Sequence, residues 1–264
     1  MPVTEDARSG VKSVEVAGQL LRLLAEAGGP MRLADLSRAA AMPSAKAHRY
    51  LVSLSRSGLV EQDPATARYE LGPLMLRAGL AALGRSDLLK RAERALEAIV
   101  ARTGETAAAA VWGTHGPTHV RLVAARHALA ASVPPGHVCP LTYSASGLVF
   151  CAFDEAERTM PFAEREMSQS RAIGRPGAPA DAAALERVLA AVRRRAFATT
   201  ANEGDTGLAA VSVPVFDAAG GRIRLALTVF SRVGRLNVAP DGPVVALMLE
   251  AAASLEAELH GLRS

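Results

Sequence analysis

The sequence is poor in cysteine and has no hydrophobic run long enough to cross a bilayer. Its 264 residues include two cysteines, Cys139 and Cys151, which are too few for a disulfide scaffold and form no CxxC pair. The first ten residues carry acidic side chains and lack the apolar core of a secretory signal, and they do not resemble a transit peptide. We therefore expect a soluble, cytoplasmic protein with reduced thiols and no membrane partner.

Acidic residues are missing from one short basic segment. The whole chain has 30 Lys and Arg against 26 Asp and Glu, a net charge of +4, so it is not uniformly basic. Residues 44–57 nevertheless contain no Asp or Glu, and Lys46, Arg49 and Arg56 stand there unopposed. Charge therefore matters in this chain through its placement. The length favours two domains with a sizeable core.

Residues 31–57 predict two short helices around a tight turn. Met42 and Pro43 interrupt the helical spacing, and Ser44 is placed to cap a second helix that runs to about Gly58. Cations beside the orphan N–H groups of a helix N-terminus suit a polyanion such as DNA. The alternative is a solvated helix in an all-α domain. The second helix leaves these polar side chains away from its packing face: Lys46, His48, Arg49, Ser53 and Arg56.

The residues after this pair predict a β-hairpin and then helices. Two alternating runs, 59–63 and 68–71, flank a turn at 64–67, and a hairpin in this position is a wing from which Arg68 could reach phosphate. Gly72 and Pro73 then separate this hairpin from the next helix. We predict a winged helix-turn-helix at residues 1–72, a linker helix at 73–86 and a second domain at 87–264.

The second domain is predicted to be α+β, with helices against one face of an antiparallel sheet. Its Gly and Pro residues at positions 174–179 favour a loop over residues 162–180, and residues 217–221 favour a hairpin turn. The expected strands are 106–112, 119–125, 138–141, 208–216 and 223–230. The expected helices are 74–84, 87–102, 144–153, 181–195 and 243–262, after a supporting helix that begins at residue 11.

The order of these parts resembles an IclR-type bacterial transcription regulator over nearly the whole chain. Three N-terminal segments carry the resemblance, residues 11–14, 42–49 and 58–72, with Ser44-Ala45-Lys46 departing from the Lys-Ser-Thr often found in relatives. The late segment matches at Ala196, Glu203, Ala210-Val211-Ser212 and Val215-Phe216-Asp217, with Thr200 where the family usually has Asp or Ser.

This resemblance implies a GAF-like effector domain that encloses a small molecule, commonly an organic acid. It also implies dimers or tetramers whose paired winged domains read a pseudo-palindromic operator in double-stranded DNA. Arg49 would serve either a phosphate or a guanine edge. The predicted DNA-binding residues are Ser44, Lys46, His48, Arg49 and Arg68.

A helix N-terminus beside the sheet is the candidate effector site. Backbone N–H groups of Ala145, Ser146 and Gly147 can hold a carboxylate, and the resemblance places effector contacts there; an ordinary capped helix is the alternative. Phe230, at a position where relatives place a ligand-contacting serine, would shrink the pocket or give an aromatic acid a ring to pack against. The predicted effector-binding residues are Leu141, Ser144, Ala145, Ser146, Thr200, Ala210, Thr228 and Phe230.

Several other residues admit a second interpretation. Cys139 near His137 suggests a nucleophile, but no base and orienting group accompany it, so we expect no enzyme. A zinc cluster of four histidines and one cysteine fits no compact zinc spacing, so we expect no metal or cofactor; its members would be His115, His119, His127, His137 and Cys139. Arg224 is a buried cation or a surface residue, and Trp112 a core residue or a ligand wall. The competing class is a sensor or enzyme whose winged domain makes protein contacts.

Overall fold

The computed structural model describes residues 10–27, 29–125, 135–202, 207–217 and 221–260. These residues form two compact units, Met1–Arg85 and Ser86–Ser264. Some of the predicted features lie outside the described residues: Glu203, His127, residues 218–220 of the hairpin turn and residues 261–262 of the last helix. None of the described helices combines the length and the apolar character needed to span a membrane.

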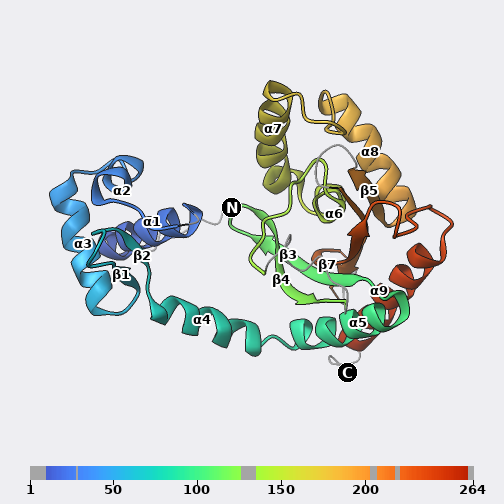
Figure 1. Cartoon of the computed structure of the whole chain (residues 1–264), viewed down its shortest axis with the longest axis horizontal. Helices are drawn as coiled ribbons and strands as arrows, with labels where there is room; N and C mark the ends of the chain where they lie inside the picture. The colour runs from blue at the N-terminus through green and yellow to red at the C-terminus, as the bar shows by residue number, and fades with distance from the viewer. Residues whose placement is uncertain (1–9, 28, 126–134, 203–206, 218–220, 261–264) are drawn as a thin grey trace, which may run out of the picture. The chain divides into compact units, whose positions relative to one another are not determined.

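The first unit is a winged helix-turn-helix, as predicted (Figure 1). The wing strands β1 and β2 pair antiparallel, and Val60 lies opposite Leu71. Met31 bridges to Tyr69, so the segment before α2 extends this small sheet. The elements are α1 (Lys12–Glu26), α2 (Leu33–Ala39), α3 (Ser44–Arg56), β1 (Val60–Gln62), β2 (Tyr69–Leu71) and α4 (Pro73–Gly84).

Apolar residues at helical spacing hold this unit together. Leu20, Leu36 and Leu51, from α1, α2 and α3, have no exposed surface, and Tyr69 of the wing packs against the same cluster. Burying a Leu side chain of this kind stabilises a fold by about 1.5–3 kcal/mol. The packing face of α3 is therefore turned inward, and its remaining faces are left to solvent.

The predicted cap of α3 is wrong. Pro43 is the residue that precedes the helix, and no side chain caps it. Ser44 is the first residue of α3, and its Oγ lies 2.9 Å from Oγ of Ser37 in α2. Ser44 therefore links the two helices across their turn, in which Ala41 has a positive φ of 50°.

The second unit is built on a five-stranded antiparallel sheet in the order β4-β3-β7-β6-β5. Its strands are β3 (Thr106–Gly113), β4 (Gly116–Val123), β5 (Ala198–Asn202), β6 (Leu208–Phe216) and β7 (Ile223–Arg232). Its helices are α5 (Asp87–Thr103), α6 (Ala145–Phe153), α7 (Ala156–Ala172), α8 (Ala182–Arg195) and α9 (Pro243–His260).

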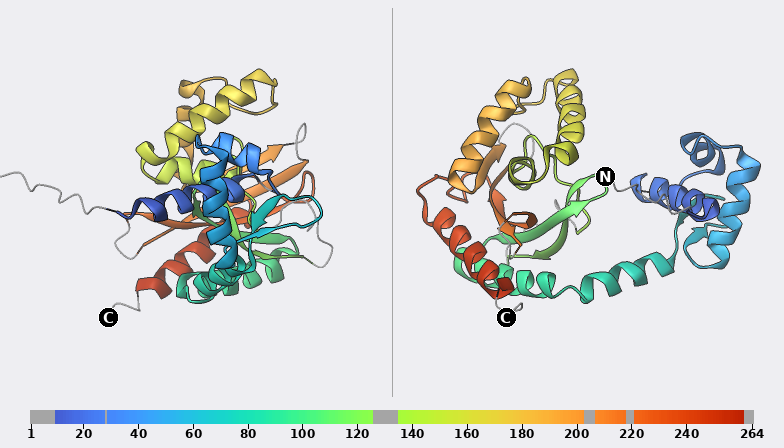
Figure 2. Two further views of the ribbon diagram at one scale, coloured as in Figure 1. Left: turned by 90° about the vertical axis from the view of Figure 1, so that its left-hand side faces the viewer. Right: turned by 180° about the vertical axis from the view of Figure 1, so that it is seen from behind.

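Helices cover both faces of this sheet, which corrects the prediction of one covered face. Figures 1 and 2 show α5 and α9 on one side and α6, α7 and α8 on the other. Residues Ala145 to Ala152 of α6 are all buried, because the sheet, α7 and α8 enclose this helix. A helix that is apolar on every side requires this kind of enclosure.

Two local predictions in the second unit are also corrected, and one strand was missed. Residues up to Ala172 of the expected loop belong to α7, because the Gly and Pro positions that favour a loop begin only at Gly174. Residues 138–141 form no strand, and Val138 makes only an isolated bridge to Thr118. Strand β5 was not predicted, since Ala-Thr-Thr-Ala-Asn has no alternation of large apolar side chains.

Candidate functional site

The exposed face of α3 carries the predicted DNA-binding residues. Ser44, Lys46, His48 and Arg49 are exposed, while Ala47 between them has no exposed surface. No carboxylate of the described residues forms an ion pair with Lys46 or Arg49. Both cations are therefore available to an external anion.

The wing carries one further exposed cation that was predicted to bind DNA. Arg68 is exposed, and its guanidinium donates a 3.3 Å hydrogen bond to the Pro30 carbonyl. Oη of Tyr69 lies 3.4 Å from Nδ1 of His48, so the wing also contacts α3. Asp63 organises the wing turn by accepting from Ala65 N–H at 2.9 Å and from Thr66 Oγ1 at 2.6 Å.

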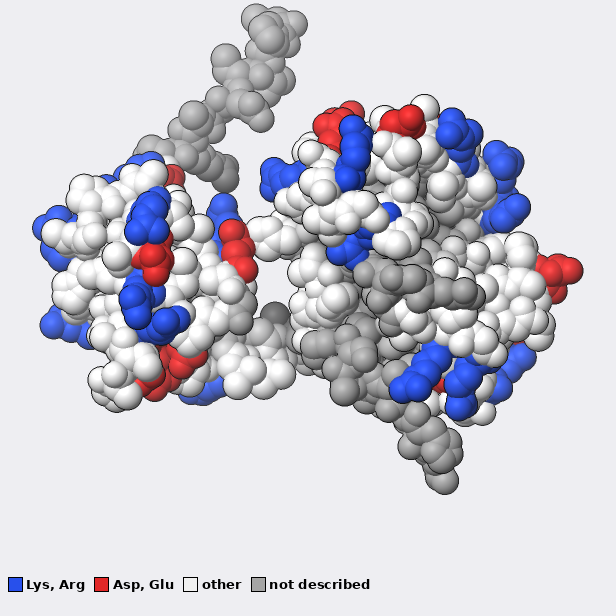
Figure 3. Space-filling model, turned by 45° about the horizontal axis from the view of Figure 1, so that its top comes forward, with Lys and Arg blue, Asp and Glu red and all other residues white. Residues whose placement is uncertain are grey.

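Basic side chains do not form a continuous surface on the face of the two units drawn in Figure 3. On the face drawn in Figure 3, Lys and Arg lie interspersed with Asp and Glu on both units. This distribution agrees with the small net charge of +4. Charge is therefore distinctive in its local placement, as in the acid-free segment at residues 44–57.

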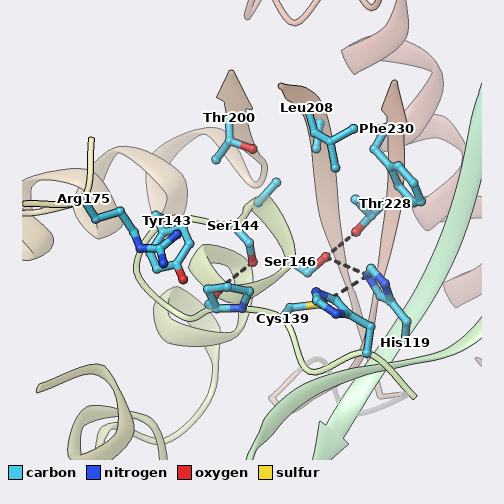
Figure 4. A pocket seen from close by; sticks show the side chains of 14 residues that line it. His119, Cys139, Tyr143, Ser144, Ser146, Arg175, Thr200, Leu208, Thr228 and Phe230 are labelled. Carbon is cyan, nitrogen blue, oxygen red and sulfur yellow. Dashed lines mark hydrogen bonds between the residues drawn. The ribbon is translucent and has the colours of Figure 1, made fainter. Parts of the chain in front are cut away.

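A cavity of about 280 Å³ lies between the N-terminus of α6 and the sheet of the second unit (Figure 4). Its volume is near the lower end of the roughly 300–1,000 Å³ typical of ligand sites. It is lined by His119, His137, Cys139, Pro140, Tyr143, Ser144, Ala145, Ser146, Arg175, Thr200, Leu208, Ala210, Thr228 and Phe230.

All but one of the predicted effector-binding residues line this cavity. The exception is Leu141, which is 2% exposed, belongs to the core and donates its N–H to Oε2 of Glu166 at 2.8 Å. Thr142 donates to the same carboxylate through its N–H at 2.8 Å and through Oγ1. Glu166, in α7, thereby ties down the segment that precedes α6.

The first turn of α6 offers fewer backbone donors than predicted. Ser144 caps this helix by accepting from the Gly147 N–H at 3.0 Å, so that N–H is not available to a ligand. The N–H groups of Ala145 and Ser146 have no acceptor among the described residues, as is usual in a first turn. A side chain at Gly147 would collide with the backbone of Pro140, so only glycine allows this close approach.

Buried hydroxyl groups form a connected chain at one wall of the cavity. Oγ1 of Thr228 lies 2.8 Å from Oγ of Ser212 and 2.8 Å from Oγ of Ser146. Oγ of Ser146 lies 3.4 Å from Nε2 of His119, which is also 3.2 Å from Sγ of Cys139. Strands β4, β6 and β7 and helix α6 thus each contribute a polar group to one network.

His119 is held in an unusual environment for a histidine. It is 5% exposed, its ring stacks on Phe230 with centroids 6.2 Å apart, and Nδ1 has no hydrogen-bond partner among the described residues. Burial, with a smaller contribution from nearby His137, lowers the pKa of His119 to about 4. The ring is therefore neutral at neutral pH.

Arg175 is the cation in the cavity lining, and it was not predicted. It follows α7 in the loop before α8, and its guanidinium lies 4.7 Å from the centroid of the Tyr143 ring. Nothing in the local pattern distinguishes Arg175 from a surface arginine, because its position in the cavity depends on how α7 packs. The other lining residues that were not predicted are His119, His137, Cys139, Pro140, Tyr143 and Leu208.

The nucleophile and metal interpretations receive no support from this geometry. The imidazole that lies within hydrogen-bond distance of the Cys139 thiol is that of His119, and burial raises the pKa of this thiol to about 12. A thiol with that pKa is protonated and unreactive at neutral pH. Within the described part of the chain, no three His, Cys, Asp or Glu side chains are grouped to hold a metal ion.

Two residues with open alternatives are also placed. Arg224 is exposed on β7, which favours the surface interpretation. Trp112 packs against Phe150 and Phe162, each with ring centroids 5.9 Å away, and does not line the cavity.

Two family descriptions cover most of the chain. Residues 13–64 match the IclR helix-turn-helix domain, and residues 80–257 match the bacterial transcriptional regulator IclR C-terminal domain. The glycerol operon regulatory protein of Streptomyces griseus is 32% identical over 234 residues, which are 88% of this chain and 88% of that protein. These matches favour the regulator over the competing class of sensor or enzyme.

Solved structures support the same assignment. HmgR of Pseudomonas aeruginosa is 34% identical, with 95% of this chain and 98% of that chain covered and a TM-score of 0.59. An IclR homologue from Microbacterium hydrocarbonoxydans, solved in complex with 4-hydroxybenzoate, shares the fold at 22% identity, with 95% and 100% covered and a TM-score of 0.70. The chain belongs to the IclR family of bacterial transcriptional regulators, which bind DNA and are not enzymes.

Proposed function

We propose that the protein binds a pseudo-palindromic operator as paired winged domains and releases or engages it in response to a small organic acid, in particular an aromatic one. In this proposal residues 1–72 bind DNA, residues 73–86 link the domains, and residues 87–264 bind the effector and mediate self-association into dimers or tetramers. The acid-free basic face of α3 is the feature that supports the DNA-binding part.

DNA contact through α3 has a measurable dependence on salt. Each phosphate that a Lys or Arg neutralises releases counterions, so affinity falls steeply as salt is added. Sequencing the genomic DNA that the protein captures would provide the operator for a titration by fluorescence anisotropy. A salt-independent affinity for that DNA would contradict operator binding through α3.

The observation that carries the effector part is the cavity at the N-terminus of α6. The cavity lining includes Arg175 and, at the first turn of α6, Ala145 and Ser146; a guanidinium and first-turn N–H groups suit a carboxylate. The walls include Leu208 and the ring of Phe230, which suit an apolar or aromatic body. The volume of about 280 Å³ favours a molecule with a single ring.

The homologous complex provides a starting ligand for this test. Because the Microbacterium protein was solved with 4-hydroxybenzoate, we expect a compound of this class to bind here and to change operator affinity. Operator occupancy then depends on the difference between the ligand affinities of two arrangements of the protein. Calorimetry with a panel of aromatic and aliphatic acids would measure binding, and anisotropy with and without ligand would measure the response.

A substitution at the cavity separates the two activities. Ala145→Glu places a carboxylate where the acid is expected, so effector binding should be abolished while operator binding without effector is retained. Ala156→Glu is the matched control, because Ala156 is exposed in the first turn of α7 and does not line the cavity. Normal effector binding by the Ala145→Glu protein would place the effector site elsewhere.

A further inference from the structure

The two sides of the cavity differ in their chemistry. Figure 4 shows Arg175 and Tyr143 at one side, and His119, Thr228 and Phe230 at the other, with Ser146 near the middle. The first side carries the guanidinium. The second side carries the network of hydroxyl groups that ends at His119.

Every member of that second side is uncharged at neutral pH. Ser146, Thr228 and Ser212 carry hydroxyl groups, each able to donate one hydrogen bond and to accept others. Burial keeps the His119 ring neutral by lowering its pKa to about 4, and keeps the Cys139 thiol protonated by raising its pKa to about 12. This side of the cavity can therefore form hydrogen bonds with a ligand, but it carries no positive charge that could balance a ligand's negative charge.

Neutral donors of this kind discriminate between ligand groups. A hydroxyl can exchange donor and acceptor roles with the network, so its hydrogen bonds are satisfied on burial. A carboxylate in the same position would be buried without a cation, and burying an unpaired charge is much more costly than burying a hydrogen-bonded hydroxyl. Burial also lowers the pKa of His137, which disfavours a positive charge on that ring.

We propose that His119, Ser146 and Thr228 form a specificity site that selects an effector with an uncharged hydroxyl opposite its carboxylate and rejects dicarboxylates. This inference rests on the proposed effector function and deepens it by naming the ligand class. Arg175 and the N–H of Ala145 take the carboxylate, Phe230 packs against the ring, and the network exchanges hydrogen bonds with the hydroxyl. Ser212 touches Thr228 from behind and positions its hydroxyl.

Three probes of one ring size test the inference on the full chain by calorimetry: benzoate, 4-hydroxybenzoate and terephthalate. One added net hydrogen bond predicts that 4-hydroxybenzoate binds about fivefold more tightly than benzoate. The second carboxylate predicts that terephthalate binds more weakly than benzoate by at least about tenfold.

A variant of the network isolates the hydroxyl contact. Thr228→Val has nearly the same shape and lacks Oγ1, so the ratio of the 4-hydroxybenzoate and benzoate affinities should fall towards one. Thr159→Val is the matched control, because Thr159 is fully buried in α7 outside the cavity, and it should leave the ratio unchanged. If circular dichroism shows that Thr228→Val is unfolded, Ser146→Ala provides the same test from the other side of the contact.

The outcomes separate this inference from the proposed function. Equal binding of benzoate and 4-hydroxybenzoate, strong binding of terephthalate, or an unchanged ratio in the folded network variant would each overturn the specificity site while leaving an acid-binding regulator intact. Failure of all three acids to bind would overturn the aromatic effector itself and the specificity site with it.

Discussion

The basic face of α3 and the cavity of the second unit use polar side chains in opposite ways. Lys46 and Arg49 are exposed, charged and unpaired by the described carboxylates, so they are ready for a ligand that brings its own charge. Ser146, Thr228 and His119 are buried, neutral and bonded to one another. In the functions proposed above, charge at the surface attracts the DNA, whereas the buried uncharged network selects the effector.

The buried cavity wall requires close packing between α6 and the segment before it. Gly147→Ala tests this packing and should give the largest loss of folding stability. The added Cβ would collide with the backbone of Pro140, which cannot move aside as a side chain can. We therefore expect the free energy of unfolding to fall by about 3 kcal/mol or more. Urea unfolding would measure it. Gly79→Ala is the control, because a Cβ there meets nothing and alanine favours helix α4. Equal stability of the two variants would show that the cavity wall is as yielding as the surface.

The neutrality of His119 predicts a stability that depends on pH. Its pKa is lowered from 6.5 to about 4 in the folded protein, so the unfolded chain takes up the proton first as the pH falls. The stability linked to the neutral His119 ring is fully present above pH 6.5. As the pH falls towards 4, the free energy of unfolding decreases by up to roughly 3 kcal/mol. Urea unfolding across this range should show less of the loss in His119→Phe. The same loss in both proteins would mean that His119 is not the group that titrates.

Arg49 tests whether the exposed face of α3 contacts the operator. Arg49→Ala should weaken operator binding by about 1–3 kcal/mol if the guanidinium contacts a base edge, with no effect on effector binding. Arg22→Ala provides the control, because Arg22 is exposed on α1. Fluorescence anisotropy on operator variants would show whether the loss is confined to one base pair. An unchanged affinity would remove Arg49 from the DNA contact.

Lys46→Ala should give the smallest change in DNA affinity, and it tests whether this lysine neutralises a phosphate. If Lys46 neutralises one phosphate, Lys46→Ala should weaken binding on all sequences and reduce the slope of log affinity against log salt by about 1. The measurement is a salt titration of both proteins on operator and on unrelated DNA. An unchanged slope would mean that Lys46 remains hydrated in the complex.

The sequence predicted the first unit more completely than the second for a physical reason. Helix α3 and the wing are specified by local signals, namely Pro43, the missing acids and the alternating strands around residues 64–67. The cap at Ser44 was wrong because its hydroxyl contacts Ser37, a residue of another helix. A local pattern cannot distinguish these two partners.

In the second unit, the errors concern elements whose environment comes from distant parts of the chain. Strand β5 contains small and polar residues and exists because β6 pairs with it. His119 and Arg175 line the cavity through the packing of β4 and of α7, and neither has a neighbouring motif. The small and hydroxyl residues before and within α6 are recognisable locally as a helix N-terminus beside a sheet, and the family resemblance favours effector contact over an ordinary capped helix. Their role as effector contacts stays a prediction.

The hydrogen bonds of Glu166 make the cavity sensitive to a residue that does not line it. Its carboxylate holds the N–H groups of Leu141 and Thr142, so α7 and the segment leading into α6 are joined at a fixed spacing. Arg175 follows α7 in the chain, and Ala145 follows that segment. Glu166 therefore helps to fix the distance between Arg175 and the N–H of Ala145, the two groups that suit a carboxylate. A substitution of Glu166 would change the cavity without removing any residue that lines it.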